Sequence, residues 1–281
     1  MDDRHRHSFR DSREDRTAAE HAPKTPQALS PTYRLAFDDG EFLLRDELRP
    51  VRLQLELLKP ELAMNEARID STIVLFGGAR IPAPEAAGSA RTETLAALCA
   101  QYEEARRFAR LVTERSMQGG GTRDVIATGG GPGVMEAGNR GAEEAGGRSI
   151  GLGIVLPHEQ EPNRYVTPEL SFNFHYFAIR KMHFLMRARA ICVFPGGFGT
   201  LDELFESLTL IQTGRMERVP VLLFGKAFWD SIVNFEALSE AGTISPADLQ
   251  LFRFVETAEE ALEAIDAWPG AGEKRQEIPG R

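Results

Sequence analysis

Several features are scarce in this chain, and each scarcity argues against a class of protein. The only two cysteines, Cys99 and Cys192, lie in apolar runs. We therefore expect free thiols in a reducing compartment rather than a disulfide framework. No apolar stretch reaches the roughly 18 residues of a membrane span, so no transmembrane helix is predicted. The first residues also lack the apolar core of a signal peptide, and the expected form is a soluble cytoplasmic protein.

Positive charge is scarce as well. The formal net charge is -9 and the isoelectric point is about 5.3, with no basic block in the sequence. Such a chain is a poor candidate for nonspecific binding to nucleic acid or to a membrane surface. An anion site would have to be local, built from a few arginines and backbone amides.

Common cofactor and metal motifs are missing. The chain contains no G-x-x-x-x-G-K-[ST], H-E-x-x-H or C-x-x-C pattern. From Gly131 it runs G-P-G-V-M-E, with Glu136 where the third glycine of a dinucleotide motif would stand. We therefore expect neither a metal ion nor a cofactor, and a mononucleotide or sugar phosphate fits better than NAD, FAD or a P-loop triphosphate.

The chain does contain short apolar segments that alternate with helical patterns. This order predicts an α/β fold: a doubly wound, Rossmann-like parallel sheet with helices on both faces. The expected organisation is a disordered tail (1–31), an N-terminal helical extension (32–70), a nucleotide-binding catalytic domain (71–268) and a C-terminal tail (269–281). We expect single helices over 92–115, 228–242 and 256–268, and an extension whose helices are broken by Pro50 and Pro60.

Glycines follow three of the predicted strands, in "FGGAR" (76–80), "TGGGPGVME" (128–136) and "PGGFGT" (195–200). Glycine lets backbone amides approach a ligand, and the helix N-terminus that follows adds unpaired N–H groups and partial positive charge. A tight packing turn is the alternative for any one loop. Three such loops at one edge of the sheet favour a phosphate-binding site. Gly78 and Arg80 are its candidate residues in the first loop.

The long irregular segment 158–175 is expected to lie near this site as a loop plus a short strand, and it contributes Glu159 and Asn163 as candidate substrate contacts. The helix that follows contains Arg180 near its start. Arg180 is either a solvated surface charge or a guanidinium that faces the phosphate cleft. Helical spacing places the remaining apolar side chains of this helix toward the core: Phe177, Ile179, Met182 and Met186.

Glu203 also has two interpretations. Thr200 and Glu203 have the T-x-x-E spacing of a capping box, in which Thr200 would be the N-cap and Glu203 would bond back to it. Capping alone would explain both residues. The alternative is that Glu203 is a catalytic carboxylate beside the glycine loop.

These motifs together resemble a known family. "PGGFGTLDE" is similar to the P-G-G-x-G-T-x-x-E motif of the LOG ("lonely guy") family of cytokinin riboside 5′-monophosphate phosphoribohydrolases, often mislabelled lysine decarboxylases. Arg180 and Lys181 match its upstream R-K, with Arg180 fifteen positions before Pro195. "TGGGPGVMEAGNRGA" resembles its first nucleotide loop. The resemblance covers residues 70–225, and the extra terminal segments look like those of a longer bacterial subgroup.

The resemblance implies hydrolysis of the N-glycosidic bond of AMP or N6-modified AMP to free base and ribose 5-phosphate, in a homodimer or higher homo-oligomer with the site near the dimer interface. It implies Arg180 and Glu203 as catalytic residues. The substrate contacts that it implies are Gly129, Gly130, Gly131, Gly133, Met135, Glu136, Lys181, Gly196, Gly197, Gly199, Thr200 and Thr209.

Two functions other than hydrolysis are alternatives for this chain. A non-catalytic nucleotide- or cofactor-binding protein on the same fold would not need Arg180 and Glu203 in register. A pyridoxal-phosphate lysine decarboxylase would need a Schiff-base lysine, and of the chain's five lysines only Lys181 lies by the predicted site.

Overall fold

The computed structural model describes residues 10–157 and 161–268. The chain divides into two compact units, Met1–Glu56 and Leu57–Arg281. Among the described residues of the first unit, Ser12–Glu20 forms α1 and Gly40–Leu43 forms α2, with short 3-10 turns at Pro31–Tyr33, Ala36–Asp38 and Asp46–Leu48. The tail that we expected to be disordered thus includes a helix. Its start has a physical cause, because the Asp11 side chain accepts a hydrogen bond from the Arg13 amide as an N-cap.

Helix α3 (Arg49–Glu66) runs through both prolines that were expected to break it. Pro50 is the second residue of the helix, where backbone amides have no intrahelical partner and a missing N–H costs nothing. Pro60 lies inside the helix, and its ring is buried together with Met64. The expected break at Pro60 was therefore wrong, since burial of the apolar ring outweighs one missing backbone hydrogen bond.

The second unit contains a seven-stranded sheet in the order β4-β3-β2-β1-β5-β6-β7, and every neighbouring pair is parallel. The predicted doubly wound α/β fold is confirmed. The strands are β1 (Thr72–Phe76), β2 (Val125–Thr128), β3 (Ser149–Ile154), β4 (Ser171–Phe174), β5 (Ala188–Val193), β6 (Val221–Phe224) and β7 (Arg253–Val255). The short edge strand β7 was not anticipated from the sequence.

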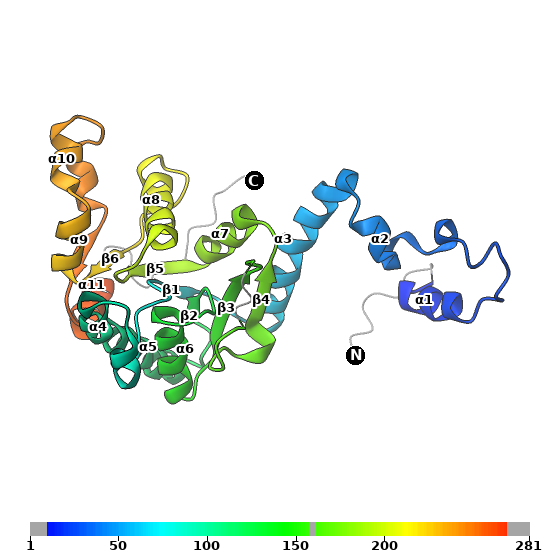
Figure 1. The fold of residues 1–281 in the computed structure, drawn as a ribbon, viewed down its shortest axis with the longest axis horizontal. Coiled ribbons are helices and arrows are strands. Elements are labelled where there is room, and N and C mark those ends of the chain that lie inside the picture. The colour runs from blue at the N-terminus through cyan, green and yellow to red at the C-terminus, as the bar shows by residue number, and fades with distance from the viewer. Residues whose placement is uncertain (1–9, 158–160, 269–281) are drawn as a thin grey trace. The chain divides into compact units, whose positions relative to one another are not determined.

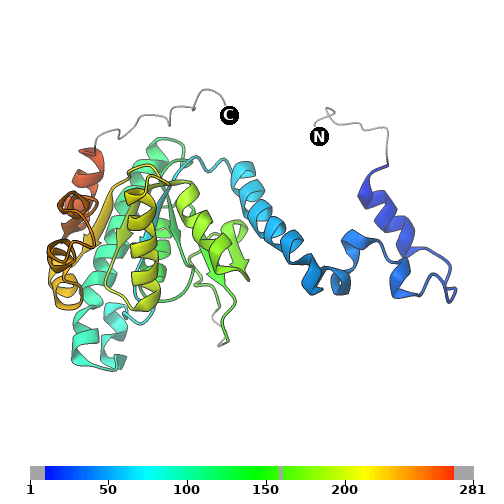
Figure 2. The ribbon, with the colours of Figure 1, turned by 90° about the horizontal axis from the view of Figure 1, so that it is seen from above.

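Helices cover both faces of this sheet (Figure 1). One layer contains α5 (Cys99–Gln118), α6 (Val134–Glu144) and α11 (Ala258–Asp266), and the other contains the end of α3 with α7 (Phe177–Met186) and α8 (Phe198–Gln212). Figure 2 shows the domain from the side of α7 and α8. Three shorter helices complete it: α4 (Glu93–Ala97), α9 (Lys226–Ile232) and α10 (Phe235–Glu240). The single helices expected over 92–115 and 228–242 were therefore wrong, since each of these segments forms two helices.

An apolar core lies on each face of the sheet, between the strands and the helices that cover that face, because side chains alternate along each buried strand. In β1, Val74 and Phe76 belong to the core under α7 and α8, whereas Ile73 and Leu75 belong to the core under α5 and α6. All five residues of β1 are buried, which is typical of a central parallel strand. Within the described residues, no helix combines the length and hydrophobicity needed to cross a bilayer.

Candidate active site

The strand order reverses between β1 and β5, and a cavity of about 820 Å³ lies where the loops after these strands meet. In open α/β sheets this switch point is the usual place for a ligand. The cavity is lined by the loop after β1, by Gly129 after β2, and by the segment that links β5 to α8. Residues of α4, α6, α7, α8 and α9 form the rest of its wall.

The first two glycine loops pack directly against each other. Gly133 has a φ of 70°, and a Cβ there would lie 2.3 Å from the Gly78 carbonyl oxygen. The Gly78 amide donates to the Pro195 carbonyl at 2.9 Å, so the third loop joins the same assembly. Glycine at 133 is therefore required by backbone conformation and by close packing. Gly133 is thus explained by the tight packing of the two loops, whereas Gly78 lines the cavity.

The third loop has both tight and open glycines. A Cβ on Gly196 would lie 2.1 Å from the Thr200 hydroxyl oxygen, so this position excludes a side chain. A Cβ on Gly197 or Gly199 would meet no heavy atom within 4 Å, and both residues line the cavity. Between them stands Phe198, whose side chain is 93% exposed. The backbone at the start of α8 is thus accessible from the cavity.

Helix α8 begins earlier than the capping-box spacing predicted. Its N-cap is Gly197, in an extended conformation with φ −98° and ψ −154°, and no side chain caps this helix end. Thr200 is therefore the third residue of the helix rather than its cap, and the predicted capping box is wrong. An extended glycine can start a helix without a side-chain cap. Glu203 lies within the helix and has no capping role.

Arg180 and Glu203 meet inside the cavity. Arg180 is the fourth residue of α7, and its Nη1 lies 3.8 Å from Oε1 of Glu203 in α8. Their side chains are only 14% and 9% exposed. The Arg180 Nε also donates to the Leu152 carbonyl at 2.8 Å, and the guanidinium lies 5.0 Å from the centre of the Phe184 ring. Arg180 is therefore not a solvated surface charge.

Burial changes the acidity of both members of this pair. It raises the pKa of Glu203 to about 7, although the positive charges of Arg180 and Lys181 act in the opposite direction. Burial also lowers the pKa of Arg180, and Glu203 opposes that change. A carboxyl group whose pKa lies near neutral pH, in a cavity and beside an arginine, is a recognised signature of a functional site.

The cavity brings together most of the residues that the sequence proposed. The predicted residues that line it are Gly78, Arg80, Gly129, Met135, Arg180, Gly196, Gly197, Gly199, Thr200 and Glu203. A Cβ on Gly129 would lie 2.7 Å from the Met135 sulfur and 2.8 Å from Nη2 of Arg180, so this glycine makes room for the arginine. Glu159 lies outside the described residues.

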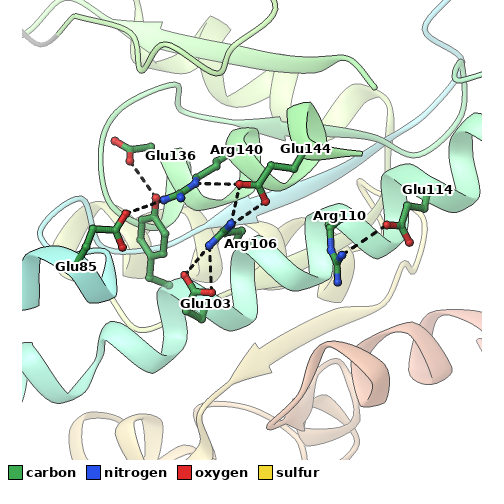
Figure 3. A network of polar contacts seen from close by, with 9 residues as sticks. Glu85, Glu103, Arg106, Arg110, Glu114, Glu136, Arg140 and Glu144 are labelled. Carbon is green, nitrogen blue, oxygen red and sulfur yellow. Dashed lines mark hydrogen bonds and ion pairs between the residues drawn. The ribbon is translucent and has the colours of Figure 1, made fainter. Parts of the chain in front are cut away.

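Glu136 has a different environment from the one expected. Its carboxylate accepts a hydrogen bond from the Tyr102 hydroxyl at 3.0 Å, between α6 and α5. Figure 3 shows this contact beside Arg140, which donates to Glu85 at 3.0 Å and to Glu144 at 3.1 Å. The polar network joins helices to the segment after β1. The structure thus gives Glu136 a partner on α5, and Glu136 is absent from the described lining of the cavity.

Asn163 stabilises the second glycine loop through hydrogen bonds of its side chain. Its side-chain amide donates to the carbonyls of Gly130 at 3.1 Å and Gly131 at 2.9 Å, and to the Asn139 side chain at 2.9 Å. Gly130, Gly131 and Gly133 are buried. These four predicted contacts are absent from the described lining of the cavity, and their observed neighbours include residues of the glycine loops and of α6.

Two further predicted contacts have partners elsewhere. The Thr209 hydroxyl donates to the Phe205 carbonyl at 2.7 Å, one turn earlier in α8, and Thr209 is exposed. The Lys181 ammonium lies 2.7 Å from Asp202 and 2.8 Å from Glu206. Of these residues only Asp202 is found on the described cavity wall.

Sequence reasoning missed the apolar part of the cavity. It includes Ile81, Leu95, Leu98, Phe177, Phe228 and Ile232. No motif marks these residues, because they come from separate elements. Phe177 was expected in the core but is half exposed at the cavity, and Met182 is exposed too. The buried residues of α7 are His183, Phe184 and Leu185, and Ile179 packs against the core as expected.

The site does not suit pyridoxal phosphate. That cofactor needs a lysine at the reacting centre, and the described residues that line the cavity include none. Lys181 is instead held between two carboxylates. Over the described ranges, no group of three or more His, Cys, Asp and Glu residues is arranged to bind a metal ion.

Comparison with solved structures gives similar folds at low similarity. A molybdenum cofactor binding protein from Rippkaea orientalis is 19% identical over 70% of this chain and 96% of its own, with a TM-score of 0.44. The molybdenum cofactor carrier protein from Chlamydomonas reinhardtii is 20% identical over the same shares, with a TM-score of 0.45. At this level of similarity, the fold is assigned from the sheet order of this chain and not from these structures.

Comparison of sequences is more specific. A family model described as "Possible lysine decarboxylase" matches residues 135–265. The cytokinin riboside 5′-monophosphate phosphoribohydrolase LOG3 of Arabidopsis thaliana is 25% identical over 54% of this chain and 70% of its own length. A probable enzyme of the same name, LOGL3 of Oryza sativa subsp. japonica, is 26% identical over 52% and 69%. The region matched by the family model contains Arg180 and Glu203, and the chain is similar to LOG-family sequences over about half of its length.

Proposed function

We propose that the protein hydrolyses the N-glycosidic bond of a nucleoside 5′-monophosphate, AMP or an N6-modified AMP, to free base and ribose 5-phosphate. The observation that supports this proposal most directly is the buried Arg180–Glu203 pair in a cavity bounded by glycine loops. The curated relatives named as phosphoribohydrolases support the same reaction class.

The glycine loop before α8 is the proposed phosphate site. Gly197 and Gly199 leave its backbone accessible, and the N-terminus of a 15-residue helix offers unpaired amides with partial positive charge. Arg80 lines the same cavity and adds a positive charge to it. The cavity, at about 820 Å³, lies within the usual range for small-molecule sites.

Glu203 is the proposed catalytic carboxylate. Glycosidic cleavage passes through a ribosyl cation with oxocarbenium character. A carboxylate beside that centre can stabilise the cation, orient the ribose hydroxyls or activate the attacking water. Stabilising the cation and activating the water both need the ionised form of Glu203. Since burial raises its pKa to about 7, the rate should increase with pH through neutrality.

Arg180 is the proposed partner of the leaving base or of the phosphate. Its guanidinium is held from one side by the Leu152 carbonyl and faces Glu203 on the other. A planar, fixed cation of this kind suits phosphate or a developing negative charge. In addition, its charge lowers the pKa of Glu203 and so favours the carboxylate that the reaction needs.

We further propose that the working form is a homo-oligomer, as the family resemblance implies. Large apolar side chains are exposed on three helices of the second unit: Leu58, Leu62, Phe177, Met182 and Phe205. Exposed apolar surface of this kind favours association. Light scattering coupled to size-exclusion chromatography measures the molar mass directly, and a mass equal to one chain would contradict the proposal.

The activity is tested by incubating the protein with AMP, N6-isopentenyl-AMP and the other nucleoside monophosphates, and measuring free base by chromatography. Adenosine serves as the control that lacks the phosphate, and it should react far more slowly. Glu203→Gln and Arg180→Met should each reduce the turnover number by about 10²-fold or more.

Absence of base from every nucleotide, with folded protein, would contradict the hydrolase proposal and favour a nucleotide-binding protein. Equal turnover by wild type and Glu203→Gln would instead contradict the assignment of Glu203.

A further inference from the structure

Lys181 follows the catalytic Arg180 directly but has a different set of partners. Its ammonium lies 2.7 Å from the Asp202 carboxylate and 2.8 Å from that of Glu206, both in α8. Its side chain is only 15% exposed. Arg180 and Asp202 are both residues of the cavity wall, whereas Lys181 is absent from the described part of that wall.

The two pairs of charges connect the same two helices. Arg180 faces Glu203, and the next residue of α7 binds the acidic residues on either side of Glu203 in α8. The Arg180–Glu203 separation of 3.8 Å is longer than a hydrogen bond, so this pair alone holds the helices loosely. Lys181 makes the two shorter contacts.

We propose that Lys181 is a positioning residue that ties α7 to α8 through Asp202 and Glu206, and so fixes Arg180 opposite Glu203. This inference rests on the proposed function, because positioning has a catalytic meaning only if Glu203 is catalytic. It differs from the direct substrate contact that the family resemblance implies for Lys181.

Lys181 also sets the charge around Glu203. The charged groups that act on Glu203 are Arg180 and Lys181, which lower its pKa, and Asp202 and Glu206, which raise it. Loss of Lys181 leaves both neighbouring carboxylates uncompensated, which should raise the pKa of Glu203. Loss of the Glu206 charge should lower it. The two changes thus move the ionisation of Glu203 in opposite directions.

The experiment compares Lys181→Met, Lys181→Arg and Glu206→Gln with wild type. The matched control is Lys226→Met, which removes an exposed lysine paired with Asp230 in α9. Turnover number and KM are measured with AMP from pH 5.5 to 9. The pKa of Glu203 is measured separately by NMR of 13C-labelled carboxyl groups, with Glu203→Gln used to assign the signal.

We expect Lys181→Met to reduce the turnover number on the order of tenfold or more at pH 7. Its KM should change little, and the acidic limb of its pH profile should move to higher pH. Glu206→Gln should move that limb to lower pH. Lys181→Arg should keep most of the wild-type turnover number, since a guanidinium can bind two carboxylates. Lys226→Met should have the same turnover number and pH profile as wild type.

A higher KM for Lys181→Met, with unchanged turnover and an unchanged pH profile, would overturn the proposal in favour of substrate contact. If Lys181→Met fails to fold, Glu206→Gln decides: an unmoved acidic limb and an unmoved Glu203 pKa overturn the proposal. If wild type releases no base from any nucleotide, the proposed function fails, yet the NMR titrations still test whether Lys181 and Glu206 act on Glu203.

Discussion

Replacing Glu203 by glutamine should make the folded protein more stable at alkaline pH. The side chain is buried, and its pKa is raised from the ordinary 4.5 to about 7. Because one pKa unit corresponds to about 1.4 kcal/mol, ionisation of Glu203 costs the folded state about 3 kcal/mol relative to the unfolded chain. Glutamine has nearly the same shape and never ionises, so Glu203→Gln avoids this cost.

The sign of the pH dependence follows from the two pKa values. Below about pH 4.5 the group is protonated in both states, and wild type and Glu203→Gln should have similar free energies of unfolding. Between about pH 4.5 and 7 the unfolded chain loses the proton first, and wild type loses stability. Above about pH 8 the variant should be more stable by about 3 kcal/mol.

Urea unfolding followed by circular dichroism at pH 5, 7 and 8.5, at one protein concentration, measures this difference. Glu240→Gln, which removes an exposed carboxylate at the end of α10, is the matched control and should change stability little at any pH. Equal or lower stability of Glu203→Gln at pH 8.5 would refute the reasoning. It would mean that Arg180 stabilises the carboxylate by more than burial destabilises it.

Two glycine substitutions should separate catalytic geometry from stability. Gly129→Ala places a Cβ 2.7 Å from the Met135 sulfur and 2.8 Å from the Arg180 guanidinium, both of which are side-chain rather than backbone atoms. Turnover should fall on the order of tenfold or more while thermal unfolding changes little, and unchanged turnover would contradict the role of this glycine. Gly133→Ala combines a φ of 70° with a Cβ 2.3 Å from the Gly78 carbonyl oxygen. The free energy of unfolding, measured by chemical denaturation, should therefore fall by more than about 2 kcal/mol. A denaturation midpoint equal to that of wild type would contradict the close packing of these loops.

The sequence predicted the elements whose signals are local. The apolar runs at 72–76 and 191–193 lie in central strands as predicted, and the glycines after them mark the carboxyl edge of the sheet. The register of Arg180 with Glu203 was also visible, because each stands at a fixed distance from the same glycine loop. Local propensity and spacing suffice for such features.

The sequence was misleading where tertiary contacts compete with local rules. Pro60 signals a helix break, but its ring is buried and α3 continues. The T-x-x-E spacing of Thr200 and Glu203 signals a capping box, but α8 starts at the open Gly197–Phe198 turn and leaves Glu203 in the cavity. A helical pattern assigned Phe177 to the core, but this first residue of α7 is half exposed and lines the cavity.

What the sequence by itself determined is the fold class and the glycine-rich edge, while the family resemblance implied Arg180 and Glu203 as catalytic residues. The tertiary structure alone decided their chemistry. Burial between α7 and α8 raises the pKa of Glu203 to about 7, and Lys181 binds Asp202 and Glu206 rather than lining the cavity. The physical reason is that desolvation and ion pairing depend on which surfaces meet in space, and no spacing along the chain encodes that distance.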